Sequence, residues 1–222
     1  MPEPHRPTPR LPRAVAPPPH VWYAAYGSNM HIARLLHYIT GGRPPGSARS
    51  HPGCRDRTPP ARSVAVVLPG AVYFATESAV WTGGRGFYDP AARGPALARA
   101  HLITAGQFAD IAAQEMYREP ESDLDLTEAV SRGRFELGPG RYETLVCPGT
   151  LDGVPVLTLT APWRMTDVAL REPSAPYVQH LAAGLNETGA WRPAEIAAYL
   201  GTCPGAAGRW TTEDVLALID PD

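Results

Sequence analysis

Proline and glycine constrain this fold more than any other feature of the sequence. The chain has 26 prolines and 21 glycines among its 222 residues, together less than the roughly 25–30% typical of low-complexity chains. Because proline fixes φ and glycine accepts φ > 0, these residues end helices and strands and favour turns. The sequence therefore predicts many short elements. Its 44% of hydrophobic residues is enough for a sizeable buried core.

The first twenty residues differ in composition from the rest of the chain. MPEPHRPTPRLPRAVAPPPH alternates proline with arginine and lacks a periodic apolar pattern, so it cannot bury enough surface to offset the entropy cost of ordering it. It also lacks the apolar stretch of a signal peptide, and no later stretch has the roughly 20 apolar residues of a membrane span. We therefore expect a disordered tail at 1–20 and one soluble, cytoplasmic domain at 21–222.

Hydrophobic patterning predicts a mixed α+β domain with a strand-rich middle and a helical end. The apolar runs at 64–68 and 71–75 are joined by Pro69-Gly70, which predicts a hairpin between them. Gly149 and Asp152-Gly153 are expected to join the strands at 142–147 and 154–160. Strands are expected at 21–26, 64–68, 71–75, around Phe87, and at 99–103, 142–147 and 154–160. Helices are expected at 32–39, near residue 110, and after Ser174, Pro193 and Thr211.

Charge and cysteine content exclude several classes of function. All 20 basic residues are arginine, which excludes Schiff-base chemistry and a phosphate-loop lysine. The first 62 residues hold nine arginines against Glu3 and Asp56, an asymmetry that suits either an anionic ligand or a solvated surface. The three cysteines are far apart and form no CxxC pair, so we expect a reducing compartment and neither a disulfide framework nor a zinc ribbon.

Glu115 is the most informative single residue. Thr104 and Gln107 predict a capping box, and Phe108, Ile111 and Glu115 then fall at helical spacing on one face. Glu115 lies within about 20° of Phe108 around that helix, whereas Asp110 and Gln114 are expected on the exposed face. Desolvation and the negative end of the helix dipole would both raise the pKa of this carboxyl. Glu115 is therefore a candidate general acid and base, unless it pairs with an arginine at the rim of the core.

A second candidate is the turn Tyr26-Gly27-Ser28-Asn29, which lies between an expected strand and an expected helix. Glycine lets a backbone approach a ligand closely, and main-chain amides at the start of a helix bind carboxylate or phosphate groups. The same letters also suit an ordinary helix cap, in which Ser28 and Asn29 bind no ligand.

These segments resemble a known family. YAAYGSNM is similar to the YGSN signature that opens the gamma-glutamylcyclotransferase-like family. ITAGQFADIAAQEM resembles the family's segment with its catalytic glutamate, at Glu115, and PGRYETLV resembles the strand whose pocket tyrosine would be Tyr142. PSAPYVQHLAAGLNETG resembles the family's later helix.

The resemblance implies a small mixed β-barrel with helices packed outside and a reaction without cofactor or metal. Glu115 would take a proton from the α-ammonium group of a γ-glutamyl amide and return it to the leaving amine, which yields 5-oxoproline and a free amine. The Tyr26–Asn29 turn would hold the glutamyl end, and Tyr142 would line the pocket. The implied partner is thus a small γ-glutamyl substrate, with no nucleic acid and no membrane.

The alternatives to this reaction are a zinc amidohydrolase, a metal-free amide hydrolase and a non-catalytic binding module. A zinc amidohydrolase would need ligands at usable spacing, yet the seven histidines are scattered and no HExxH occurs. A metal-free amide hydrolase and a non-catalytic binding module, whose arginine-rich segment contacts nucleic acid, both remain open. His51, Cys54, Arg55 and Asp56 are expected to be solvated turn residues in a loop at 43–62. The group of Trp81, Gly83, Gly84, Arg85 and Phe87 either lines a pocket mouth or forms a strand bend.

Overall fold

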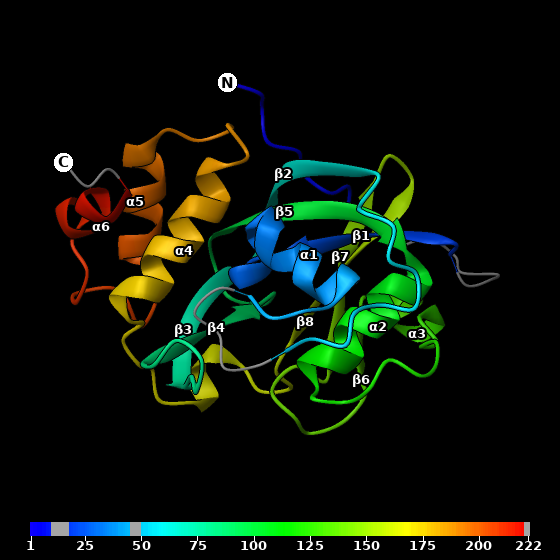
Figure 1. Cartoon of the computed structure of the whole chain (residues 1–222). Coiled ribbons are helices and arrows are strands. Elements are labelled where there is room, and N and C mark those ends of the chain that lie inside the picture. The colour runs from blue at the N-terminus through cyan, green and yellow to red at the C-terminus, as the bar shows by residue number, and fades with distance from the viewer. Residues whose placement is uncertain (10–17, 45–49, 220–222) are drawn as a thin grey trace.

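The computed structural model describes residues 1–9, 18–44 and 50–219 (Figure 1). Eight strands are present in this part of the chain: β1 (His20–Ala25), β2 (Arg62–Pro69), β3 (Ala71–Glu77), β4 (Gly84–Asp89), β5 (Pro95–Thr104), β6 (Arg134–Glu136), β7 (Thr144–Leu151) and β8 (Val154–Thr160). The α-helices are α1 (Ile32–Thr40), α2 (Ala105–Glu115), α3 (Thr127–Arg132), α4 (Ala175–Asn186), α5 (Pro193–Thr202) and α6 (Thr212–Ile219). Two 3₁₀ turns, η1 (Ser28–Met30) and η2 (Met165–Asp167), complete the elements.

Six strands form the main sheet in the order β2-β5-β1-β8-β7-β6. The β1–β8 pair is parallel, and the other neighbours are antiparallel. Helix α2 contacts β1 and β5, whereas α4, α5 and α6 pack together at one end of the molecule (Figure 1). The predicted single-domain α+β class is confirmed. The strand pairing is open, because β2 and β6 are the edges of the main sheet.

The predicted hairpin at Pro69-Gly70 is wrong. Strand β2 pairs with β5, whereas β3 leaves this sheet and pairs with β4 in a separate two-stranded ribbon. Gly70 has φ +107°, and a Cβ there would lie 2.5 Å from the Asp89 carbonyl oxygen. Pro69-Gly70 is thus a corner between two sheets, which the local letters do not distinguish from a hairpin turn.

The expected connection through Asp152-Gly153 is a hairpin between β7 and β8, whereas Gly149 lies within β7 and not in the connection. Both residues have positive φ, 54° and 77°, as a two-residue turn between antiparallel strands requires. The tip of this hairpin reaches back to β1, because the Trp22 indole N–H donates to the Leu151 carbonyl over 3.1 Å. The Trp22 indole thus links this tip to β1.

The amino-terminal segment contributes to the fold, contrary to the expectation of a disordered tail. His5 pairs with Val66 on β2, and Thr8 pairs with Thr150 on β7. The segment therefore connects β2, an edge of the main sheet, to the end of β7. It appears in dark blue beside β2 (Figure 1). A segment can pair with the edge of a sheet through its backbone N–H and C=O groups, whatever its side chains are. The composition of the segment therefore did not predict this contact. The rest of the expected tail, at 10–17, lies outside the described residues.

Helix α2 begins as predicted but is covered on more sides than predicted. Thr104 and Gln107 form the expected capping box. Asp110 and Gln114, expected on the exposed face, are 1% and 0% exposed. The Arg55 backbone N–H and side-chain Nε donate to the Asp110 carboxylate over 2.8 and 2.9 Å. The loop before β2 thus covers the polar face of α2, which helical periodicity alone could not reveal.

Across the described residues, the helices are too short or too polar to span a membrane.

Candidate active site

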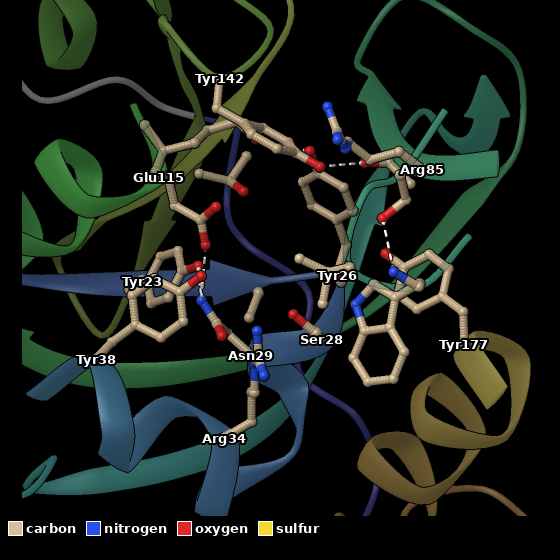
Figure 2. A pocket seen from close by; sticks show the side chains of 18 of the residues that line it. Tyr23, Tyr26, Ser28, Asn29, Arg34, Tyr38, Arg85, Glu115, Tyr142 and Tyr177 are labelled. Atoms are coloured by element: carbon tan, nitrogen blue, oxygen red, sulfur yellow. Dashed lines mark hydrogen bonds between the residues drawn. The ribbon is translucent and has the colours of Figure 1, made fainter. Parts of the chain in front are cut away.

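A pocket of about 100 Å³, partly open to solvent, lies where the η1 turn, the β3–β4 ribbon, the end of α2 and helix α4 meet (Figure 2). All the site residues expected from the sequence line it: Tyr26, Gly27, Ser28, Asn29, Glu115 and Tyr142. They come from segments far apart in the chain. The structure thus brings together the two features that the sequence singled out separately.

The carboxylate of Glu115 lies at the last residue of α2 and faces the turn. The Asn29 side-chain amide donates to Glu115 Oε1 over 3.1 Å and to the Tyr23 hydroxyl over 3.2 Å (Figure 2). The Tyr38 side chain also lies near this carboxylate (Figure 2). Glu115 is half-buried, so it lies at the wall of the pocket and not inside the core. Among the described residues, the neutral Asn29 amide thus orients the carboxylate, which lines the pocket.

The two tyrosines beside Glu115 stay protonated near neutral pH. Burial raises the pKa of Tyr23 above its usual value, and the Glu115 charge raises it further. Burial, and then the Glu115 charge, likewise raise the pKa of Tyr38 well above its ordinary value. Both hydroxyls therefore act as neutral donors or acceptors beside the carboxylate. The sequence analysis missed both tyrosines. Tyr23 lies on β1, three residues before Tyr26, and Tyr38 lies on α1, nine residues after Asn29. Their places on the strand and the helix that flank the turn were the available signal.

The turn at 26–29 is not an ordinary helix cap. Gly27 precedes η1 and His31 precedes α1, and neither cap position has a side-chain cap hydrogen bond. Asn29 uses its side chain on Glu115 and Tyr23 instead. The Tyr26 hydroxyl donates to the Leu159 carbonyl over 2.7 Å, so Tyr26 fixes the turn to β8. Ser28 and Asn29 are thus left to face the pocket (Figure 2).

Arg34 is a functional candidate that the sequence analysis missed. It lies on α1 five residues after Asn29, lines the pocket, and points toward the turn (Figure 2). Its guanidinium carbon is 5.7 Å from the centre of the Trp81 ring. No ion pair of Arg34 occurs with any acidic group in the part of the chain that the structure describes. This cation is available for an anionic ligand.

Aromatic rings form the opposite wall. The Tyr142 hydroxyl donates to the Gly86 carbonyl over 2.9 Å, which fixes its ring against the β3–β4 ribbon (Figure 2). Tyr177 on α4 stacks on Trp81 with ring centres 5.3 Å apart. A Cβ at Gly86 would lie 2.9 Å from the Tyr177 hydroxyl, so this glycine is required for the ring to pack here. Trp81 and Arg85 line the pocket, as one of the two interpretations of that segment expected.

The loop before β2 is more ordered than expected for solvated turn residues. His51 and Cys54 are buried, and His51 lines the pocket. Burial, with the nearby Asp110 and Asp56 charges, raises the pKa of the Cys54 thiol to about 12. Cys54 therefore stays a neutral thiol and is not a nucleophile. Asp56 is exposed, as predicted.

Within residues 1–9, 18–44 and 50–219, no three His, Cys, Asp or Glu side chains lie close enough together to hold a metal ion. The pocket offers a carboxylate, an amide, hydroxyls, a free cation and aromatic walls. This set can bind a zwitterion and transfer a proton.

Comparison with known proteins gives few matches. No model of a protein family matches the chain. Histone deacetylase 5 of Arabidopsis thaliana is 31% identical over 200 residues, which cover 81% of this chain and 30% of that protein. The chain therefore spans less than a third of that relative's length.

The solved structures similar to this chain include the following two. An uncharacterised human protein has a TM-score of 0.43 at 16% identity, covering 77% of this chain and 80% of that one. A gamma-glutamyl cyclotransferase has a TM-score of 0.48 at 14% identity, covering 89% of this chain and 98% of that one.

Proposed function

We propose that this chain is a cofactor-independent γ-glutamyl cyclotransferase, which converts a γ-glutamyl amide into 5-oxoproline and a free amine. The observation that carries the proposal is the hydrogen bond between Asn29 and Glu115. It joins the YGSN turn to a carboxylate 86 residues away, at the wall of a pocket. The sequence resemblance assigned a role to each segment separately, and the contact unites them in one site.

The reaction needs one group that accepts and then returns a proton. Glu115 takes a proton from the α-ammonium group, and the freed nitrogen attacks the γ-carbonyl carbon. The C–N bond to the leaving amine breaks as Glu115 returns that proton to the amide nitrogen. The attacking nitrogen then loses its second proton through Glu115 to the released amine, so the products are a neutral lactam and an ammonium ion, and the carboxylate is regenerated. Because the attack is intramolecular and closes a five-membered ring, placement of the substrate supplies much of the rate.

The charges of the pocket suit a zwitterionic glutamyl group. Its ammonium would lie at Glu115, and its α-carboxylate at Arg34 and the Ser28–Asn29 turn, which lie beside one another (Figure 2). Main-chain amides of the turn would stabilise the oxyanion that forms on the γ-carbonyl. Tyr142 and Trp81 would flank the leaving amine.

The test is product analysis on a panel of γ-glutamyl amides, with 5-oxoproline and glutamate measured separately. We expect 5-oxoproline. Glutamate as the main product would support a metal-free amide hydrolase on the same pocket, and no product from any member would favour a binding module. An Nε-acetyl-lysine peptide belongs in the panel because of the partial match to Histone deacetylase 5, and acetate release would replace the proposal with a deacylase.

Glu115→Gln keeps the shape of the side chain and removes the base. We expect turnover to fall by roughly 10²–10⁴-fold, the usual contribution of acid–base catalysis. Glu121→Gln is the matched control, because Glu121 is an exposed acid outside the pocket. A folded Glu115→Gln variant with wild-type turnover would exclude Glu115 as the general base.

A further inference from the structure

Two consecutive carbonyl groups of the turn are each held by an imidazole from outside the pocket. The Ser28 carbonyl oxygen lies 3.1 Å from Nε2 of His180 on α4. The Asn29 carbonyl oxygen lies 3.2 Å from Nε2 of His101 on β5. Neither histidine is among the residues that line the pocket, and neither has a role in the reaction proposed above.

Both imidazoles are neutral and carry their proton on Nε2. Burial lowers the pKa of His101 to about 3, with the Arg99 charge acting in the same direction. Burial lowers the pKa of His180 to about 4, with the His31 and Arg34 charges adding to the effect. A carbonyl oxygen only accepts, so Nε2 must be the donor in each ring. Ser63 fixes this tautomer in His101, because its hydroxyl lies 2.8 Å from Nδ1 and donates to that nitrogen.

Neutral donors suit this position. A charged imidazolium beside the turn would compete with Arg34 for an anionic substrate, whereas a neutral N–H orients the carbonyl without adding charge. The peptide unit is planar and trans, so fixing the Ser28 carbonyl also fixes the direction of the Asn29 N–H. Fixing the Asn29 carbonyl orients the residue whose side chain holds Glu115 and Tyr23.

The geometry points to His101 and His180 as positioning residues for two different functions of one turn. His101 aligns Asn29, and through it the carboxylate of Glu115, for proton transfer. His180 aligns Ser28 and the adjoining amide for binding of the substrate carboxylate. The assignment of these functions rests on the proposed cyclotransferase reaction, whereas the two hydrogen bonds are properties of the fold.

The test compares a variant that keeps the N–H donor with one that removes it, at each histidine. Gln has an amide N–H that can replace Nε2–H, whereas Met fills similar volume without a donor. For His101→Met we expect kcat to fall at least about tenfold, while KM stays within about threefold of the wild-type value. For His180→Met we expect KM to rise at least about tenfold, while kcat is retained. His101→Gln and His180→Gln should each recover most of the loss.

A purely structural role predicts a different result. If the histidines only fill space, Met and Gln variants will lower the midpoint of thermal unfolding without separating kcat from KM, and that result would overturn the inference. Equal kinetics for the Met and Gln variants would also overturn it. Should His101→Met fail to fold, Ser63→Ala removes the hydroxyl that fixes the tautomer of His101 from an exposed position, and it should lower kcat with KM unchanged.

Failure of the proposed reaction is recognised separately. The wild type is assayed first, and absence of 5-oxoproline there refutes the cyclotransferase proposal. The affinity of the wild type and of both His180 variants for γ-glutamyl-alanine, measured by calorimetry, then tests the positioning of Ser28. Binding weakened by Met and restored by Gln supports it, whereas identical affinities, or no binding to the wild type, overturn it.

Discussion

The docking of the amino-terminal segment can be tested through Gly149, which lies beside Thr8. Gly149 has φ +148°, and a Cβ built there would lie 2.1 Å from the Thr8 carbonyl oxygen and 2.8 Å from the Thr8 carbonyl carbon. Backbone atoms cannot yield as a flexible side chain can. Gly149→Ala must therefore displace either the segment or the end of β7.

The expected cost has two parts. Displacing the segment breaks the hydrogen bonds from Thr8 N–H to the Thr150 carbonyl, 2.8 Å, and from Thr150 N–H to the Thr8 carbonyl, 2.9 Å. At about 0.5–1.5 kcal/mol each, these contribute about 1–3 kcal/mol. Alanine at positive φ adds about 1–3 kcal/mol of backbone strain. We expect Gly149→Ala to destabilise the full chain by about 2–6 kcal/mol.

A double-mutant cycle separates the two parts. In a chain lacking residues 1–9 only the backbone strain remains, so the penalty should shrink by about 1–3 kcal/mol, the coupling between Gly149 and the segment. Urea unfolding at constant m-value gives each free energy of unfolding. Gly153→Ala is the matched control, because Gly153 has φ +77° and nothing lies within 4 Å of its Cβ position. Its penalty should be equal in both chains.

Either of two results would contradict the docking of the amino-terminal segment beside β7. If Gly149→Ala costs the same with and without residues 1–9, the segment does not occupy the space beside β7. If removal of residues 1–9 leaves the urea midpoint and the Gly149→Ala penalty unchanged, the segment behaves as the dispensable tail that its composition predicts.

Three further predictions concern the pocket wall, the loop before β2 and acid stability. Gly86→Ala should lower the free energy of unfolding by about 1–3 kcal/mol, the usual cost of overpacking. Adding Tyr177→Phe should recover most of this loss, because it removes the hydroxyl that would lie 2.9 Å from the new Cβ. Asp110→Ala should cost at least the roughly 1.5–3 kcal/mol of one hydrogen bond to a charged group, because both carboxylate oxygens accept from Arg55, and thermal unfolding measures it. The pKa of His101 is lowered from 6.5 to about 3 on folding, so the unfolded chain binds more protons between these values. Stability should therefore rise with pH from about 3 to 6.5 and be lost on acidification, with a slope of up to roughly 1.4 kcal/mol per pH unit that His101→Gln removes. Equal slopes in the two proteins would contradict the burial of a neutral imidazole.

The sequence by itself determined the features that depend on neighbours a few residues apart. The capping box at Thr104 and Gln107, the two-residue turn at Asp152-Gly153 and the helix that ends at Glu115 all follow from local hydrogen bonds, φ preferences or helical periodicity. The YGSN letters likewise indicated a turn between a strand and a helix. These elements formed where predicted because their cause lies within the segment itself.

Only the tertiary structure decided which groups meet. Pro69-Gly70 changes sheets because β5 pairs with β2 and β4 pairs with β3, a choice made by strands far along the chain. Asp110 is buried because Arg55 lies over it. His101 and His180 reach the turn through hydrogen bonds that span 72 and 152 residues of sequence. Arg34 is placed at the pocket by its packing against Trp81. Such contacts depend on burial and on hydrogen bonds between distant segments, which no local pattern of residues encodes.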